Sequence, residues 1–248
     1  MKTAGGARSH VALRVAIVGR GRMGHALAAA LAGAGCDVLG PLGRGADGEG
    51  ADVVLLCVPD AQIAAAATLV VPGRLVGHTS GATTLAPLAP HESFSIHPLM
   101  TVTGADARFD GAGCVIAGST ARALESAGTL ARLLGMRPAQ VADEDRPLYH
   151  AAASMASNYV VTLAGAAERL AASVGVDRSL LAPLVRAAVE NWASRGPGRA
   201  LTGPIARGDD ATAARQRAAV AARAPELVPL WDALAERTRD LARTGARE

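Results

Sequence analysis

The feature that most constrains this chain is the stretch GRGRMG, residues 19–24, which joins an apolar run to a helix-like segment. Its glycines, Gly19, Gly21 and Gly24, have the spacing G-x-G-x-x-G. In this context the first glycine permits a tight turn, the second lets a pyrophosphate approach the backbone, and the third lets the helix pack on the strand. The helix N-terminus then offers free N–H groups to the phosphates. The sequence therefore predicts a dinucleotide-binding unit near the start of the chain.

Apolar, strand-like runs alternate with helical stretches through the first half of the sequence. This alternation predicts an α/β fold, a Rossmann domain with a doubly wound parallel sheet over residues 1–142. In open sheets of this kind ligands bind beyond the carboxyl ends of the strands, so we expect the functional site there. The predicted strands cover residues 13–19, 36–40, 52–58, 74–80, 93–97, 113–119 and 136–142.

The predicted cofactor is NADP, with NADPH preferred over NADH. NAD-binding proteins usually carry an acidic residue at the end of the second strand, whereas residues 39–44 read LGPLGR. The guanidinium of Arg44 suits a 2′-phosphate, although a solvated loop arginine is the alternative interpretation. The residues expected to contact the cofactor are Gly19, Arg20, Gly21, Arg22, Met23, Gly24, Arg44, Val58, Pro59, Ser80 and Gly81.

The second half, residues 143–248, is predicted to be an all-α domain. We expect a long helix over residues 147–174 and a second one over residues 179–195. A loop over residues 196–210 follows, and then two more helices, of which the last is amphipathic.

The first long helix carries an unusual polar face. His150, Ser154, Ser157 and Asn158 follow the spacing i, i+4, i+7 and i+8, so they share one side of an α-helix. Small hydrogen-bonding groups and one titratable ring indicate a catalytic surface that lines the cleft between the two domains. A polar helix contact that is satisfied internally, or a dimer seam, is the alternative.

Composition excludes several classes of function. The net charge is +3 and the basic residues are scattered, so we expect no nucleic-acid partner. We find no apolar run long enough for a membrane span, and the first ten residues lack the apolar stretch of a signal peptide. Cys36, Cys57 and Cys114 lie in apolar runs without CxxC spacing, which is typical of reduced thiols and predicts a cytoplasmic protein. Lys2 is the only lysine, which disfavours Schiff-base chemistry and a P-loop.

The segments GRGRMGHAL, HTSGATTL, SIHPLM, YHAAASMASNY and LTGPIARGD resemble an uncharacterised Rossmann-like branch of the two-domain NAD(P)-dependent reductases. This superfamily, with a C-terminal domain like that of 6-phosphogluconate dehydrogenase, includes ketopantoate reductase, pyrroline-5-carboxylate reductase, hydroxyisobutyrate dehydrogenase and the deazaflavin-dependent NADP reductases. The resemblance covers nearly the whole chain and implies a homodimer formed through the helical domain. In the hydroxy-acid members the first long helix of the second domain bears a catalytic lysine and, four residues later, an asparagine. Asn158 matches that asparagine, and Ser154 stands where the lysine would be.

Together these features predict an NADPH-dependent reductase of a small carbonyl compound, with a 2-oxo acid such as ketopantoate as first choice. His150 is expected to donate the proton to the developing alkoxide, Ser154 to hydrogen-bond the reacting oxygen, and Asn158 to orient the substrate. The residues expected to bind substrate are His97, Ser157, Thr202 and Arg207, with Arg199 as a further candidate cation.

Other functions stay open at this stage. An imine substrate of the pyrroline-carboxylate type, a deazaflavin as hydride partner, and a non-catalytic NADP(H)-binding regulatory protein each fit the same motifs. His97 precedes a proline in a predicted fixed loop, where it could instead cap a backbone carbonyl. Metal binding by His78, His97 and His150 has no ligand spacing in its favour, so no metal is expected.

Overall fold

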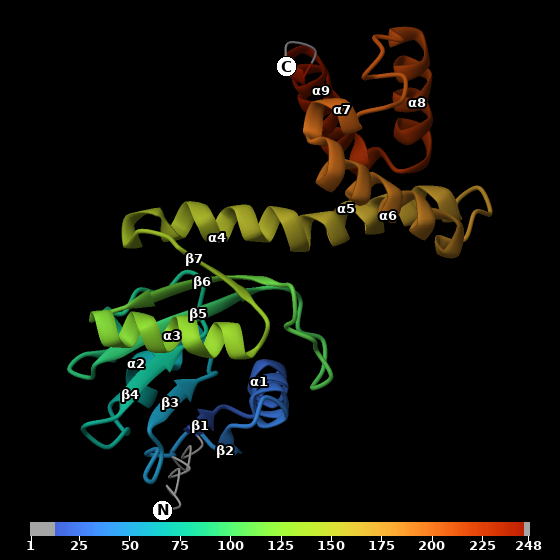
Figure 1. Cartoon of the computed structure of the whole chain (residues 1–248). Coiled ribbons are helices and arrows are strands. Elements are labelled where there is room, and N and C mark those ends of the chain that lie inside the picture. The colour runs from blue at the N-terminus through green and yellow to red at the C-terminus, as the bar shows by residue number, and fades with distance from the viewer. Residues whose placement is uncertain (1–12, 246–248) are drawn as a thin grey trace, which may run out of the picture. The chain divides into compact units, whose positions relative to one another are not determined.

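The computed structural model describes residues 13–245, and these form two compact units (Figure 1). Unit 1 runs to Ser157 and unit 2 begins at Asn158. Lys2 and the segment examined for a signal peptide lie outside the described residues. We retain residues 142 and 143 as the proposed domain boundary, because the last strand ends at Gln140 and every later element is helical. No helix in the described part of the chain is long and apolar enough to cross a membrane.

Unit 1 contains a seven-stranded sheet with the strand order β2-β1-β3-β4-β5-β6-β7. All neighbouring strands are parallel except β5 and β6, which run antiparallel. Residues 100–112, which connect these two strands, form no helix, and an antiparallel neighbour needs no crossover helix. The strands are β1 (Arg14–Val18), β2 (Asp37–Leu42), β3 (Val53–Leu56), β4 (Leu75–His78), β5 (Ser93–Leu99), β6 (Gly113–Gly118) and β7 (Arg137–Gln140).

The sheet is covered on both faces, which explains why its central strands are apolar without alternation. On one face Val15 and Ile17 of β1 belong to a core that includes residues of α1 (Arg22–Gly33) and α3 (Ala121–Leu133). On the other face Ala16 and Val18 join a second core with the short helix α2 (Ile63–Ala67). The predicted Rossmann domain with an all-α second half is therefore confirmed, with one antiparallel strand pair inside the sheet.

The first long helix differs from its prediction. Instead of one α-helix over residues 147–174, the chain forms α4 (Arg146–Ser154), a π-helical turn (Met155–Tyr159) and α5 (Val160–Ala172). A π turn closes its hydrogen bonds over five residues rather than four, so side chains within it no longer follow the α-helical spacing. The predicted single polar face is corrected accordingly, because Ser157 and Asn158 lie inside the π turn.

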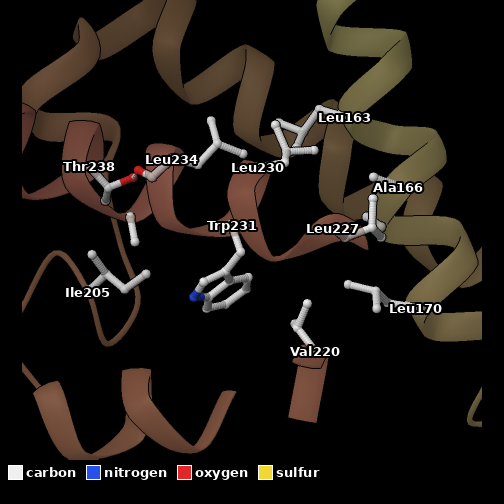
Figure 2. A pocket seen from close by; sticks show the side chains of 12 residues that line it. Leu163, Ala166, Leu170, Ile205, Val220, Leu227, Leu230, Trp231, Leu234 and Thr238 are labelled. Atoms are coloured by element: carbon white, nitrogen blue, oxygen red, sulfur yellow. Dashed lines mark hydrogen bonds between the residues drawn. The ribbon is translucent and has the colours of Figure 1, made fainter. Parts of the chain in front are cut away.

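Unit 2 continues with α6 (Arg178–Arg195), α7 (Pro197–Ala200), α8 (Asp210–Arg223) and α9 (Val228–Gly245). Helix α7 lies within the segment predicted as a loop over residues 196–210. This unit has a hydrophobic groove of about 180 Å³. Figure 2 shows Trp231 of α9 in the middle of its lining side chains. Such a groove is smaller than the usual 300–1,000 Å³ of small-molecule sites, so we interpret it as helix packing. Its lining comprises Leu163, Ala166, Ala167, Leu170, Ile205, Val220, Leu227, Leu230, Trp231, Leu234, Ala235 and Thr238.

Candidate active site at the carboxyl ends of the strands

In the glycine-rich turn between β1 and α1, two of the three glycines stand where a side chain would clash with the backbone. Gly19 has φ +126°, and a Cβ atom there would lie 2.2 Å from the carbonyl oxygen of Cys57. A Cβ on Gly24 would lie 1.9 Å from the carbonyl oxygen of Gly19. Larger residues at either position would push the turn away from the sheet, so these glycines set the close approach of strand and helix.

Gly21 is the N-cap of α1, and the space around it suits phosphate groups. No side chain caps the helix, and nothing lies within 4 Å of the position that a Cβ of Gly21 would take. The first N–H groups of α1 are therefore available to an anion, as a dinucleotide pyrophosphate requires. Arg20 and Arg22 are exposed beside this turn, and Met23 is half-buried. These residues fit the predicted cofactor.

Arg44 lies close to the end of β2. Strand β2 ends at Leu42, and the exposed Arg44 follows within two residues. Within residues 13–245 no acidic side chain forms an ion pair with Arg44. Its guanidinium is thus free to receive a 2′-phosphate.

The segments after β3 and β4 meet through Ser80. Val58 and Pro59 follow β3, and Asp60 begins a 3-10 helix (Asp60–Gln62). The buried Ser80 hydroxyl donates to Asp60 Oδ2 at 2.7 Å and accepts from the N–H of Thr83 at 3.0 Å. The Ser80 side chain is therefore engaged in holding its own turn, and the backbone of this turn is what it can offer a cofactor. Sequence reasoning did not identify Asp60.

His78 is a structural residue in this arrangement. It is fully buried, its Nε2 lies 3.0 Å from the carbonyl oxygen of Thr84, and its Nδ1 accepts from the N–H of Ser80 at 3.2 Å. A carbonyl can only accept, so Nε2 carries the proton and the ring is neutral. Burial lowers the pKa of His78, which also favours the neutral ring. Both nitrogens are occupied, which argues against the alternative that His78 ligates a metal.

His97, Tyr149 and His150 form the cluster at the centre of the site. His97 lies within β5, not in a loop as predicted, and Pro98 after it is also part of the strand. Beyond Ser95 this strand pairs only with β6, and proline is tolerated where one side of a strand is free. The His97 ring stands edge-on to Tyr149 and His150, with centroid separations of 5.6 and 5.8 Å.

Gly81 lies directly against both imidazole rings. A Cβ on Gly81 would be 2.7 Å from Cε1 of His97 and 2.9 Å from Cδ2 of His150. The turn after β4, which was predicted to lie at the nicotinamide, therefore touches the two candidate histidines. The sequence suggested Gly81, His97 and His150 separately, and the fold brings them together.

The protonation states of His97 and Tyr149 follow from their surroundings. Burial lowers the pKa of His97 to about 4, and the nearby His150 and Arg146 act in the same direction. Burial raises the pKa of Tyr149 to about 12. At neutral pH, Tyr149 is thus a phenol and His97 a neutral imidazole. The Tyr149 hydroxyl and Nδ1 of His97 lie 2.5 Å apart and share a hydrogen bond.

Arg146 underlies this cluster and was not identified from the sequence. Its side chain is fully buried, with Nε bonded to Asp143 Oδ1 and Nη2 to Ser95 Oγ, each at 2.9 Å. Among the described residues its Nη1 has no hydrogen-bond partner. The partner carboxylate of Asp143 is half-exposed, so the positive charge of Arg146 is only partly compensated.

The remaining predicted site residues lie outside this cluster and make few side-chain hydrogen bonds. Ser154 and Ser157 are half-buried and Asn158 is exposed, and their side chains form no hydrogen bond within the described chain. Thr202 and Arg207 are exposed in unit 2, in the segment between α7 and α8. Arg199 of α7 donates from Nε to the carbonyl oxygen of Arg195.

Three solved structures illustrate the fold. Protein BF3122 of Bacteroides fragilis, described as a candidate NADP oxidoreductase, has a TM-score of 0.78, 19% identity, and coverage of 92% of this chain and 98% of its own. Protein TM1727 of Thermotoga maritima has a TM-score of 0.77, 22% identity and coverage of 94% and 100%. A reductive aminase of Aspergillus terreus, solved with NADPH and ethyl levulinate, has a TM-score of 0.65, 19% identity and coverage of 92% and 93%. These likenesses confirm the predicted resemblance to two-domain reductases at the level of fold.

Sequence comparison gives the family. No curated protein shows significant sequence similarity to the chain. One family model matches residues 112–238, slightly more than half of the 248 residues, and spans β6 through most of α9. The chain therefore belongs to the family described as domain of unknown function (DUF2520).

Proposed function

We propose that this protein is an NADPH-dependent reductase of a small carbonyl compound. The observation that carries the proposal lies in unit 1. A dinucleotide-binding turn at the end of β1 shares its sheet edge with the cluster of Gly81, His97, Tyr149 and His150. A cofactor site and proton-carrying groups at the carboxyl ends of neighbouring parallel strands are the arrangement that hydride transfer requires.

NADPH would be held by the turn from Gly19 to Gly24 and by Arg44. When bound, it supplies a hydride to the substrate carbon. Preference over NADH rests on the exposed guanidinium of Arg44 and on the lack of an acidic residue where β2 ends. Val58, Pro59 and the backbone of Ser80 and Gly81 complete the proposed cofactor contacts.

The chain supplies the proton and the hydrogen bonds. Reduction of a carbonyl places negative charge on its oxygen, which must be stabilised and protonated. His150 is the proposed proton donor, and His97 the proposed hydrogen-bond donor to substrate. Ser154, Ser157 and Asn158 are proposed to orient the substrate further along the helix.

A 2-oxo acid such as ketopantoate is the first proposed substrate. The reductive aminase among the solved structures makes an imine the second candidate, since its fold is shared. A non-catalytic NADP(H) sensor is the competing class, and it would account for a site without lysine.

The deciding experiment follows NADPH absorbance and fluorescence with purified protein. The panel comprises ketopantoate, other 2-oxo acids, 1-pyrroline-5-carboxylate and an oxidised deazaflavin. Consumption of NADPH with one class identifies the reaction. NADPH binding without consumption by any compound would favour the sensor.

A second copy of the chain is the proposed partner. Along α6, Leu180, Leu184 and Trp192 are 69%, 68% and 56% exposed, and their spacing places them on one helix face. A large exposed apolar stripe of this kind indicates an association surface. Light scattering should therefore give a dimer, and Leu184→Glu should shift it to monomer. The cytoplasm remains the proposed location, because all three cysteines are free thiols.

A further inference from the structure

We propose that the site selects an uncharged carbonyl oxygen over a protonated imine, because Tyr149 donates to Nδ1 of the buried His97 ring and leaves Nε2 as the nitrogen that carries the proton. The inference rests on the proposed function and names the substrate class within it. In this arrangement His97 touches the reacting oxygen, whereas Tyr149 is a positioning residue that acts through His97.

The hydrogen bond between Tyr149 and His97 carries the first step. We take the phenol as the donor to Nδ1, 2.5 Å away, because a phenol O–H is a stronger donor than a neutral imidazole N–H. Nε2 is then the only protonated nitrogen of a neutral ring. Nε2 forms no hydrogen bond with described residues, and it is not among the buried polar atoms without a partner. It is therefore accessible and can donate to a ligand.

The second step concerns charge. A donor N–H stabilises a carbonyl oxygen as negative charge develops on it, and a neutral imidazole can do this without losing its proton. A protonated imine presents an N–H of its own and a positive charge, so it faces a donor with no acceptor. The buried and partly compensated charge of Arg146 adds to this repulsion, because low dielectric strengthens electrostatic interactions.

The groups that face His97 reinforce this state. The titratable and charged groups around the ring are Arg146, Tyr149 and His150 of α4, His78 of β4 and Asp60 of the 3-10 helix after β3. Burial does most to lower the pKa of His97, His150 and Arg146 act in the same direction, and only Asp60 among these groups opposes them. Tyr149 in turn faces Arg146 and Cys114 of β6.

The first test compares two substrates that both carry a carboxylate and differ in the reacting group. NADPH consumption is measured with ketopantoate and with 1-pyrroline-5-carboxylate at a pH where the imine is protonated. The proposal expects kcat/KM to be at least about tenfold higher for the ketone. Faster reduction of the imine would overturn the proposal while leaving the reductase function intact. Consumption with neither compound, nor with the wider panel, would remove both.

The second test needs no turnover. Two-bond ¹H–¹⁵N spectra of ¹⁵N-histidine-labelled protein distinguish protonated from unprotonated ring nitrogens, and the His97→Asn variant assigns the signal. We expect His97 to be protonated on Nε2 alone between pH 6 and 8. In Tyr149→Phe, a larger share of the rings should carry the proton on Nδ1. A proton on Nδ1, or on both nitrogens, in the unmodified protein would refute it.

The kinetics of the same variants link the tautomer to function. Tyr149→Phe should lower kcat about tenfold, the worth of one hydrogen bond, with little change in KM. His97→Asn should lower kcat about 10²- to 10³-fold, as loss of an oxyanion donor does. Tyr159→Phe is the matched control, because Tyr159 is exposed and outside the cluster. Equal rates for Tyr149→Phe and the control would contradict the positioning role.

Discussion

Replacing Gly81 by alanine tests whether the two imidazole rings act at the positions that the fold gives them. The new Cβ would lie 2.7 Å from His97 and 2.9 Å from His150, against about 3.4 Å for an ordinary contact. The His97 ring must therefore retreat by about 0.7 Å (3.4 − 2.7) and the His150 ring by about 0.5 Å (3.4 − 2.9). Overpacking of this degree costs about 1–3 kcal/mol of stability.

The consequence for activity should exceed the consequence for folding. Misplacement of reacting groups by about 1 Å can cost 10²-fold in rate, so Gly81→Ala should lower kcat about 10- to 100-fold. Thermal unfolding measures the cost in stability, and binding of 2′,5′-ADP reports whether the dinucleotide turn is intact. Gly33→Ala is the matched control, since nothing lies within 4 Å of its Cβ position on α1. Unchanged turnover and unchanged histidine NMR shifts in Gly81→Ala would refute the argument.

Three further predictions address the cofactor, the acid and the pH dependence. Arg44→Ala should weaken NADPH binding at least about tenfold, the loss of one charge-assisted hydrogen bond, and leave NADH binding unchanged in a fluorescence titration; equal effects on both would assign Arg44 to the solvated loop. His150→Ala should lower kcat about 10²- to 10⁴-fold with near-normal NADPH affinity, and unchanged turnover would remove His150 from the mechanism. Because the pKa of His97 falls from 6.5 unfolded to about 4 folded, the unfolded chain binds more protons between these values. The free energy of unfolding, measured by urea titration, should therefore fall by up to about 3 kcal/mol as the pH drops from 6.5 to 4. In His97→Asn this free energy should depend less on pH over the same range.

The dinucleotide turn could be predicted from sequence because its chemistry is local. Gly19, Gly21 and Gly24 lie within six residues, and their spacing reflects backbone contacts inside one strand–turn–helix unit. Strands such as β1, β3 and β4 were found for a similar reason, since each is a short, buried apolar run. Strand β7, with the sequence RPAQ, was placed by the alternation of strands and helices instead. The direction of β6 was not found, because strand direction depends on the connection and not on the strand itself.

The central cluster could be predicted only in part. Tyr149 and Arg146 precede His150 by one and four residues, yet nothing in the sequence shows that β5 packs against this end of α4. A buried arginine is uncommon, and its burial is decided by Ser95 and Asp143, which lie 51 and 3 residues away. The π turn was missed as well, because the preference of MASNY for a π turn over an α turn is too weak to recognise locally.

The position of the cluster bears on how the proposed reductase could work with no lysine among residues 13–245. In the hydroxy-acid reductases that this chain resembles, the lysine position corresponds to Ser154, which is half-buried here and makes no hydrogen bond within the described residues. His150 lies four residues earlier, on the same face and about one helical pitch, 5.4 Å, towards the N-terminus of α4. At that level the helix meets β5 and the turn after β4, which supply His97 and Gly81. In the proposed function, the proton donor His150 therefore lies one helical turn along α4 from Ser154, beside a second candidate donor on the sheet, His97. Two imidazoles would then serve in place of a single flexible cation, and burial, with His150 and Arg146, keeps the pKa of one of them, His97, low.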